Sequence, residues 1–255
     1  MIEFFRTLQY IIENGIIIFT IFIFGSYVAL AIFSALSMLQ YIRKNSYIDY
    51  KVLLSSPLAP SISVIAPAYN EGKTIIDNIR SLLSLHYNDF EVIIVNDGSK
   101  DDSMKKIIKA YDLEPVNVLY EQKVVTKTVK AVYKSKNKAF NKLVVIDKEN
   151  GGKADALNAG INFSQKEYIS VVDVDSVLVE DALLIMAKPF LEETERKIIA
   201  SGGVIRIANS CKIEEGRITE VKLPKKFIPR VQVLEYTRSF LMGRMAWSKL
   251  NGLLL

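Results

Sequence analysis

Residues 90–99 read Phe90-Glu91-Val92-Ile93-Ile94-Val95-Asn96-Asp97-Gly98-Ser99, an apolar run that ends in a polar turn. Such a run without polar alternation is typical of a parallel strand covered on both faces. Further strands are predicted at 61–66, 116–120, 143–146 and 168–172, with helical stretches at about 73–85, 101–111 and 154–163. This alternation predicts an α/β fold: an open, mostly parallel sheet with flanking helices and right-handed crossovers.

The composition limits the kinds of metal site and partner that the chain can have. The 255 residues contain one cysteine and one histidine, which excludes an intramolecular disulfide and a multi-histidine zinc site, so any metal is expected to be a hard cation held by carboxylates. With 33 basic and 28 acidic residues, the net charge is +5. This mild excess suits an anionic small substrate or a lipid surface, and we expect no nucleic-acid partner.

A membrane segment is predicted near the amino terminus. Residues 14–42, between Glu13 and Arg43, form a run of 29 without a charged side chain, enough to cross a bilayer. We expect one transmembrane helix at about 16–39 within an N-terminal segment 1–44, then a connector 45–60. A signal peptide and a buried core helix are weaker alternatives, because the start is not basic and the run has no polar face. Arg43, Lys44 and Lys51 predict that the domain 61–255 faces the cytoplasm, which makes the chain single-pass.

Two polar turns follow the first two strands. Pro67-Ala68-Tyr69-Asn70-Glu71-Gly72 leads into a helix, and a nucleoside could lie against the Tyr69 ring with Glu71 beside it. Asp97 could accept a hydrogen bond from a uracil imide or a ribose hydroxyl. Ordinary turn and capping chemistry explains both segments equally well in isolation.

A glycine-glycine-lysine turn follows the strand at 143–146. The segment 149–160 contains Gly151-Gly152-Lys153, in which two glycines let the backbone approach a polyanion and the lysine places a cation against it. The spacings G-x-x-x-x-G-K-[ST] and G-x-G-x-x-G are absent, so the common ATPase and dinucleotide-binding functions lose support.

Two aspartates one residue apart end the last predicted strand. In Val171-Val172-Asp173-Val174-Asp175-Ser176, strand alternation places both carboxylates on one side, where they could hold Mg²⁺ or Mn²⁺ bridging a diphosphate. The alternative is a pair of solvent-facing aspartates, which the apolar strand and the preceding Gly-Gly-Lys turn make less attractive.

These four elements, together with the amino-terminal helix, resemble the family 2 inverting glycosyltransferases of the GT-A fold, over residues 58–255. Within that family the chain is most similar to membrane polysaccharide synthases, such as those that make poly-N-acetylglucosamine, hyaluronan, chitin and cellulose. The resemblance implies a nucleotide-sugar donor, UDP-linked, a saccharide or lipid-linked acceptor, and Mg²⁺ or Mn²⁺. The roles that it implies are nucleoside binding by Tyr69 and Glu71, uracil or ribose contact by Asp97, diphosphate contact by Lys153, donor contact by Asp173 and metal binding by Asp175. It leaves the roles of Asp155 and Asn158 open.

The chain also departs from this family. The downstream aspartate that acts as catalytic base, and the Gln-x-x-Arg-Trp motif of processive members, are not found, so the chain is expected to hold the donor half of a longer enzyme. The pair Glu180-Asp181 is interpreted as charge at a helix start. Two alternatives stay open: a catalytically incomplete membrane fragment that only binds nucleotide-sugar or a partner, and a non-processive lipid-phosphate glycosyltransferase. A nucleotidyltransferase is more distant, because no glycine-rich basic loop follows the first strand.

Three further segments carry structural expectations. Seven lysines between residues 121 and 142 are expected to form a solvated or membrane-facing edge. Residues 201–206 are expected to form a strand, and residues 235–244 an amphipathic helix. His86 and Cys211 are expected to be structural.

Overall fold

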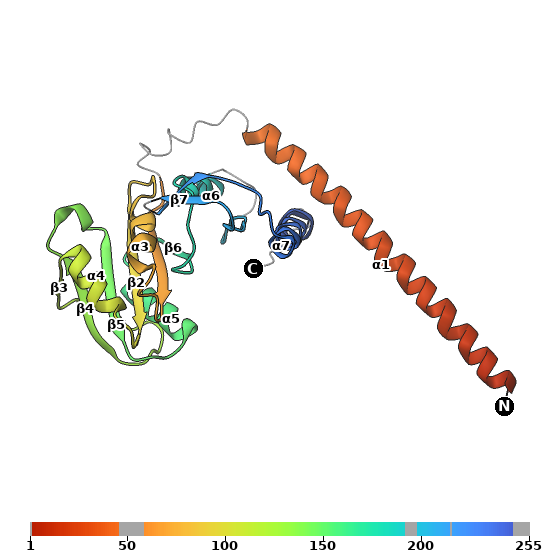
Figure 1. Cartoon of the computed structure of the whole chain (residues 1–255), viewed down its shortest axis with the longest axis horizontal. Coiled ribbons are helices and arrows are strands. Elements are labelled where there is room, and N and C mark those ends of the chain that lie inside the picture. The colour runs from red at the N-terminus through yellow and green to blue at the C-terminus, as the bar shows by residue number, and fades with distance from the viewer. Residues whose placement is uncertain (1, 46–58, 192–197, 215, 247–255) are drawn as a thin grey trace. The chain divides into compact units, whose positions relative to one another are not determined.

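A computed structural model describes residues 2–45, 59–191, 198–214 and 216–246 of the chain. Its centre is a six-stranded sheet in the order β3-β4-β5-β2-β1-β6 (Figure 1). β1 (Ile62–Ala68), β2 (Phe90–Asp97), β5 (Leu143–Lys148) and β6 (Tyr168–Val171) are parallel to their neighbours in this group. β3 (Leu113–Pro115) and β4 (Val129–Ser135) are added antiparallel. The predicted α/β class with a mostly parallel sheet is therefore confirmed.

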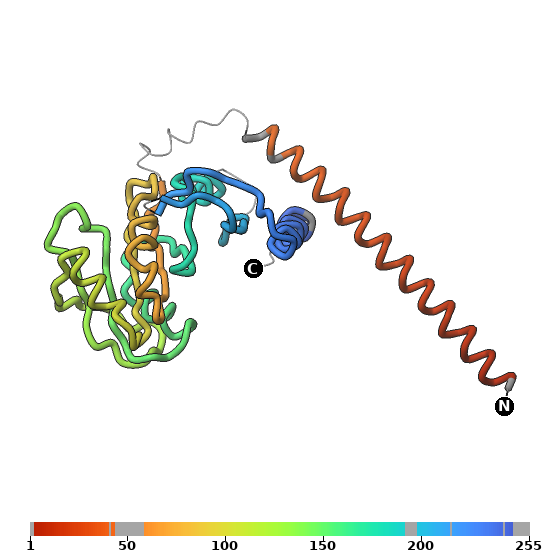
Figure 2. The backbone as a smooth tube through the Cα atoms, in the orientation of Figure 1, coloured from red at the N-terminus to blue at the C-terminus, as the bar shows by residue number. Residues whose placement is uncertain are grey.

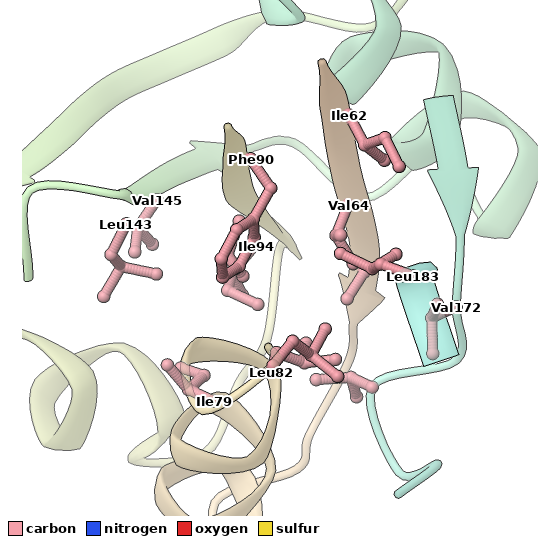
Figure 3. Packing of buried hydrophobic residues seen from close by; sticks show 14 of the residues in the cluster. Ile62, Val64, Ile79, Leu82, Phe90, Ile94, Leu143, Val145, Val172 and Leu183 are labelled. Atoms are coloured by element: carbon pink, nitrogen blue, oxygen red, sulfur yellow. The ribbon is translucent and has the colours of Figure 1, made fainter. Parts of the chain in front are cut away.

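Helices cover both faces of this sheet, because the parallel strands are apolar on both sides. On one face, α3 (Ile75–Leu83), α4 (Ser103–Tyr111) and α6 (Ala182–Leu191) pack against Val64, Ile94 and their neighbours. Figure 3 shows Ile79 and Leu82 of α3 directed toward these strands. On the opposite face, α5 (Lys153–Phe163) packs Ala156, Ala159 and Phe163 against Ile65, Ile93 and Ile146.

The strand register aligns the ends of the parallel strands. Ala68 of β1 lies opposite Asn96 of β2, and Asp97 of β2 lies opposite Lys148 of β5. The segments that follow β1, β2, β5 and β6 therefore leave from one edge of the sheet. β1 lies between β2 and β6, with α3 and α5 on opposite faces, so the order of the strands reverses beside β1. In open α/β sheets, ligands bind at such a reversal, beyond the carboxyl ends of the strands.

Two strand predictions are wrong. Residues 116–120 are not a strand; Leu119 in this run is fully exposed, and the antiparallel neighbour of β5 is β4 instead. β4 was missed because lysines at its exposed positions, Lys130 and Lys134, interrupt the apolar pattern around buried Val132. Residues 201–206 also form no strand, and Val204 and Ile205 are exposed there. A hairpin of β7 (Lys212–Glu214) and β8 (Arg217–Glu220) was not predicted.

The chain divides into two compact units, of which the second holds the sheet, its helices and the β7-β8 hairpin. The first unit contains α1 (Ile2–Asn45), residues 204–210, α7 (Phe227–Thr237) and the π-helix η2 (Arg238–Arg244). Among the described residues, α1 is the one helix long and apolar enough to cross a membrane, and it is unbroken over 44 residues (Figure 2). The helix expected at 235–244 is present as the end of α7 and η2. The predicted connector 45–60 lies almost wholly outside the described residues.

Within the first unit, α1 and η2 are in contact. The Ser34 hydroxyl of α1 donates a hydrogen bond to the Leu241 carbonyl of η2, and Ser34 is buried. The guanidinium of Arg244 lies over the Phe240 ring, 4.2 Å from its centroid. Within this unit, η2 therefore packs against the long apolar helix α1, with the Ser34–Leu241 hydrogen bond among their contacts.

Candidate functional site

The turns after β1 and β2 are bound to each other at the carboxyl edge of the sheet. Asn70 adopts a positive φ of 57°, and its N–H donates to the Ser99 hydroxyl at 2.9 Å. In return, the Lys100 N–H donates to Oδ1 of Asn70 at 2.8 Å. Tyr69, beside Asn70, is 46% exposed, so its ring is available at the surface of this joined pair of turns. Two of the predicted motifs are therefore brought together.

A second contact secures the same pair of turns. The Gly72 N–H donates to Oδ2 of Asp101 at 2.9 Å. Hydrogen bonds from the Ser103 hydroxyl, and from the N–H groups of Ser103 and Gly72, hold the pKa of Asp101 below its usual value although burial acts in the opposite direction. The half-buried Glu71 lies four residues before α3, and its carbonyl accepts hydrogen bonds from the N–H groups of Thr74 and Ile75. The turn that carries Tyr69 and Glu71 is thus fixed by the start of α4.

Asp97, the last residue of β2, is buried, with 3% exposure. Its Oδ1 accepts hydrogen bonds from the Gly151 N–H at 2.9 Å and from the Lys148 ammonium at 2.9 Å. Its Oδ2 accepts from the Gly152 N–H at 2.8 Å. The sequence led us to expect these glycine amides to face a polyanion, but both are donated to Asp97. A direct contact of Asp97 with a nucleoside stays a prediction. Oδ2 of Asp97 accepts one hydrogen bond from Gly152, so it could accept one more from a ligand.

Lys148, the last residue of β5, was not predicted from the sequence as a member of the site. It has no exposed surface, and its ammonium contacts Asp97, Asp155 and the carbonyl of Glu149. Burial alone would lower the pKa of Lys148, but the hydrogen bonds to Asp155 and Asp97 outweigh this effect, so the pKa lies above its usual value. Its position could have been suspected from the sequence, since a charge that ends a buried parallel strand needs a partner.

Lys153 begins α5 directly after the glycine turn, where Gly152 has a φ of 89°. The side chain of Lys153 is 60% exposed and forms an ion pair with Oδ1 of Asp173, whose side chain is 53% exposed. The Gly-Gly-Lys turn and the Asp-x-Asp segment are therefore in direct contact. This places a cation and a carboxylate together at an accessible position on the carboxyl edge, with Asp175 two residues further along the chain.

The two aspartates lie beyond the strand rather than in it. β6 ends at Val171, and Asp173 and Asp175 follow in a turn. Val172 and Val174 are buried whereas Asp173 and Asp175 are exposed, so the expected alternation persists past the strand end. The Val172 N–H still donates to the Ile65 carbonyl of β1, one residue beyond the end of β6, and the Ser176 N–H donates to the Asp173 carbonyl in the turn that follows.

The donor set of these aspartates suits a hard divalent cation. Among the residues that the structure describes, no three histidine, cysteine or acidic side chains come together as a complete ligand group. Magnesium sites are commonly built from one or two carboxylates, water and the phosphates of the substrate. Two exposed carboxylates beside a lysine fit that incomplete set, which a bound diphosphate would complete.

The acidic pair Glu180-Asp181 lies away from this edge. Both carboxylates contact His86, with Nδ1 of His86 3.0 Å from Oδ1 of Asp181 and Nε2 3.4 Å from Oε2 of Glu180. His86 belongs to the connection that enters β2 at its amino end, and Glu180-Asp181 immediately precedes α6. This agrees with the interpretation of the pair as structural charge at a helix start.

Comparison with known proteins gives a matching sequence family. Residues 63–127 and 125–249 match the family described as Glycosyl transferase family 2. A poly-beta-1,6-N-acetyl-D-glucosamine synthase of Staphylococcus epidermidis is 35% identical over 153 residues, and one of Staphylococcus aureus strain COL is 31% identical over the same length. Each match covers 60% of this chain and 30% of the relative, so the matched stretch spans less than a third of these relatives.

Two solved structures show partial similarity to the chain. Staphylococcus aureus TarS, residues 1–349, is 24% identical, with a TM-score of 0.37, covering 51% of this chain and 32% of that one. The mannosyltransferase PcManGT from Pyrobaculum calidifontis, solved in complex with GDP-Man and Mn²⁺, is 20% identical. Its TM-score is also 0.37, and the match covers 62% of this chain and 41% of that one.

Proposed function

The chain belongs to glycosyl transferase family 2, and we propose that its carboxyl sheet edge binds a nucleotide-diphosphate sugar, UDP-linked, whose sugar the whole protein transfers to an acceptor hydroxyl with inversion. The observation that carries this proposal is the contact between Lys153 and Asp173. It joins a motif suited to a diphosphate with a motif suited to a divalent cation, at the edge where open α/β sheets bind ligands.

The exposed groups of the edge divide between the parts of such a donor. The Tyr69 ring would stack on the nucleobase, with the Glu71 carboxylate near the nucleoside, since aromatic faces accept any base. Lys153 would contact the diphosphate as a flexible point charge. Asp173 and Asp175 would hold Mg²⁺ or Mn²⁺, with Asp173 the nearer to the donor sugar. A contact of buried Asp97 with the uracil or ribose belongs to the same proposal.

The chemistry is direct displacement at the anomeric carbon. The acceptor oxygen forms a bond to this carbon as the bond to the diphosphate breaks, and the acceptor proton passes to a base. The bound cation would supply charge neutralisation of the departing diphosphate. Lys153 exchanges its Asp173 partner for a phosphate oxygen and so adds a second positive charge at the leaving group. We assign the base to none of the described residues.

The N-terminal helix supports a membrane setting for this activity. α1 would cross the bilayer, and Arg43, which is exposed at its carboxyl-terminal end, favours a cytoplasmic position for the sheet domain. The acceptor would be a saccharide or a lipid-linked saccharide. Similarity to poly-beta-1,6-N-acetyl-D-glucosamine synthases makes UDP-N-acetylglucosamine the first donor to try.

The test is calorimetric titration of UDP into detergent-purified protein with Mn²⁺, paired with a UDP-release assay on UDP-N-acetylglucosamine. We expect binding that depends on Mn²⁺ and is lost in Asp173→Ala and Asp175→Ala. Asp77→Ala, an exposed aspartate of α3 paired with Arg80, is the matched control and should bind as the wild type does. Binding without UDP release would support a donor site in a chain that needs a further base. No binding by the wild-type protein would overturn the proposal.

A further inference from the structure

Lys148 is a charged group of this edge to which the proposed transfer gives no role. It is a lysine without exposed surface at the end of a central parallel strand. Lysine is almost never fully buried unless its charge is paired, because desolvation of an ammonium is costly. The free-energy cost of burying the Lys148 ammonium therefore points to a role that a neutral side chain of similar size would not fill.

The ammonium of Lys148 has as many partners as it has N–H donors. It donates to Oδ1 of Asp97 at 2.9 Å, to the Glu149 carbonyl at 2.6 Å, and to Oδ1 of Asp155. An ammonium has three N–H groups, so its hydrogen-bonding capacity is filled. Lys148 thus ties the end of β2, through Asp97, to the first turn of α5, through Asp155.

The two carboxylates in turn hold main-chain groups. Asp97 accepts the N–H groups of Gly151 and Gly152. Asp155 accepts the Lys127 N–H at 3.0 Å on Oδ2, which adds the loop before β4 to the cluster. A Cβ atom on Gly151 would overlap the Asp155 carboxylate, so the packing leaves no room for a side chain there.

This cluster explains how Lys153 reaches Asp173. β5 and β6 are separated by β2 and β1, which at the usual strand spacing places their ends about 14 Å apart. The glycine turn crosses part of that distance because Asp97 binds it above the end of β2. α5 then packs over β2 and β1, the two strands between β5 and β6, and the side chain of Lys153 at its start reaches Asp173 beyond the end of β6.

We propose that Lys148, acting with Asp97 and Asp155, is a positioning residue that fixes the glycine turn and so presents Lys153 to the diphosphate of the donor. The inference rests on the proposed function for the identity of that ligand. The fixing of the turn does not depend on it. Lys148 itself touches no ligand, because its three N–H groups are already bound within the protein.

The test compares variants that separate folding from positioning. Lys148→Met alone leaves two carboxylates without their cation and is expected to destabilise the protein. Lys148→Met combined with Asp155→Asn restores the net charge of the cluster and removes the contacts that link Asp97 to Asp155 through Lys148. Lys142→Met is the matched control: Lys142 immediately precedes β5 and donates to the carbonyls of Tyr87 and Asn88 at the opposite end of the strand.

The first measurement needs no nucleotide. Amide hydrogen exchange in the full chain should show slow exchange at Gly151 and Gly152, and the Lys148→Met/Asp155→Asn protein should exchange these amides faster by at least tenfold, with no such change in Lys142→Met. Rapid exchange at both glycines in the wild-type protein would overturn the proposal, whatever the variants do.

The second measurement is the UDP affinity in Mn²⁺. The Lys148→Met/Asp155→Asn protein should bind UDP on the order of tenfold more weakly, about the loss expected for one charged hydrogen bond. The same pair of substitutions in a Lys153→Met background should cause little further loss, because the residue that they position is gone. Fully additive losses would overturn the positioning role. Absence of UDP binding in the wild-type protein would refute the proposed function. The hydrogen-exchange measurement would still test whether Lys148 fixes the glycine turn.

Discussion

Lys153, at the first position of α5, forms an ion pair with Asp173, two residues beyond the end of β6. The pair joins segments that are twenty residues apart in the chain, and both side chains are more than half exposed. An exposed pair of this kind is held weakly, so either member can change partner when a ligand with a stronger charge arrives. We therefore expect the cation and the nucleotide to respond differently to loss of the lysine.

Lys153→Met should have opposite effects on the two ligands. Without the lysine, Asp173 has no competing cation, so the affinity for Mn²⁺ alone should rise, by up to about fivefold for an exposed pair. The affinity for UDP in saturating Mn²⁺ should fall on the order of tenfold, because a charged contact to the diphosphate is lost. Calorimetry with Mn²⁺ and then UDP measures both. Lys105→Met, an exposed lysine of α4, is the control, and a fall in both affinities would contradict the exchange.

Asp175→Asn should separate metal binding from nucleotide binding. The amide keeps the shape of the side chain and removes the negative charge that a hard cation prefers. We expect the gain in UDP affinity on adding Mn²⁺ to disappear, while UDP binding in the presence of a chelator stays at the wild-type level. An unchanged response to Mn²⁺ would show that Asp175 is not a metal ligand.

Tyr69→Leu should weaken binding of uridine, UMP and UDP by the same factor, since the ring would contact the base and not the phosphates. Loss of one base–aromatic stack corresponds to roughly tenfold or more. Tyr69→Phe keeps the ring and should bind nearly as the wild type does. A loss confined to UDP, or an equal loss in both variants, would contradict stacking.

Asp155→Asn should reduce stability in a pH-dependent way. Burial alone would raise the pKa of Asp155, but the hydrogen bonds from the Lys148 ammonium and the Lys127 N–H lower it below its usual value. Because the pKa is lower in the folded state, the charge stabilises the fold above about pH 4 and this contribution is lost as the pH falls through the folded-state pKa. Urea unfolding should show a difference of about 1–3 kcal/mol between wild type and variant at pH 7 that shrinks toward pH 3. A difference independent of pH would contradict a charged Asp155.

Leu183→Ala tests the packing of α6 on the sheet. Leu183 is fully buried in the cluster that contains Val64 and Ile94 (Figure 3). Truncation of a buried leucine costs about 2–5 kcal/mol of unfolding free energy. Val179→Ala, at a position 55% exposed just before α6, should cost little by comparison. Equal small losses would mean that α6 is not part of the core.

The sequence allowed the parallel core and its edge to be predicted because buried parallel strands have a distinctive composition. The runs that became β1, β2 and β5 are apolar and mostly buried, and the run that became the half-buried edge strand β6 is similar in composition. The polar turns after these runs mark where they end. The edge strands were harder. β4 is half exposed to solvent, and its lysines interrupt the apolar pattern. Residues 116–120 have the composition of a strand but form no strand.

The candidate site was predictable in its exposed members and not in its buried ones. Spacing identified Lys153 and Asp173 as members of two motifs, although not their contact, which depends on how the glycine turn is held. The partners of Asp97 could not be deduced either, since they come from a segment more than fifty residues away that approaches only when β5 pairs with β2. Long-range pairing of this kind leaves no local pattern.

If α1 crosses a membrane, as we propose, its length has a consequence for the surrounding bilayer. The uncharged residues 14–42 span about 43 Å as a helix, against a hydrocarbon core of about 30 Å. α1 is unbroken over this whole length, so it has no kink that would shorten it. In a membrane, such a positive hydrophobic mismatch is relieved by strong tilt of the helix or by local thickening of the lipid, and it favours residence in thicker membranes.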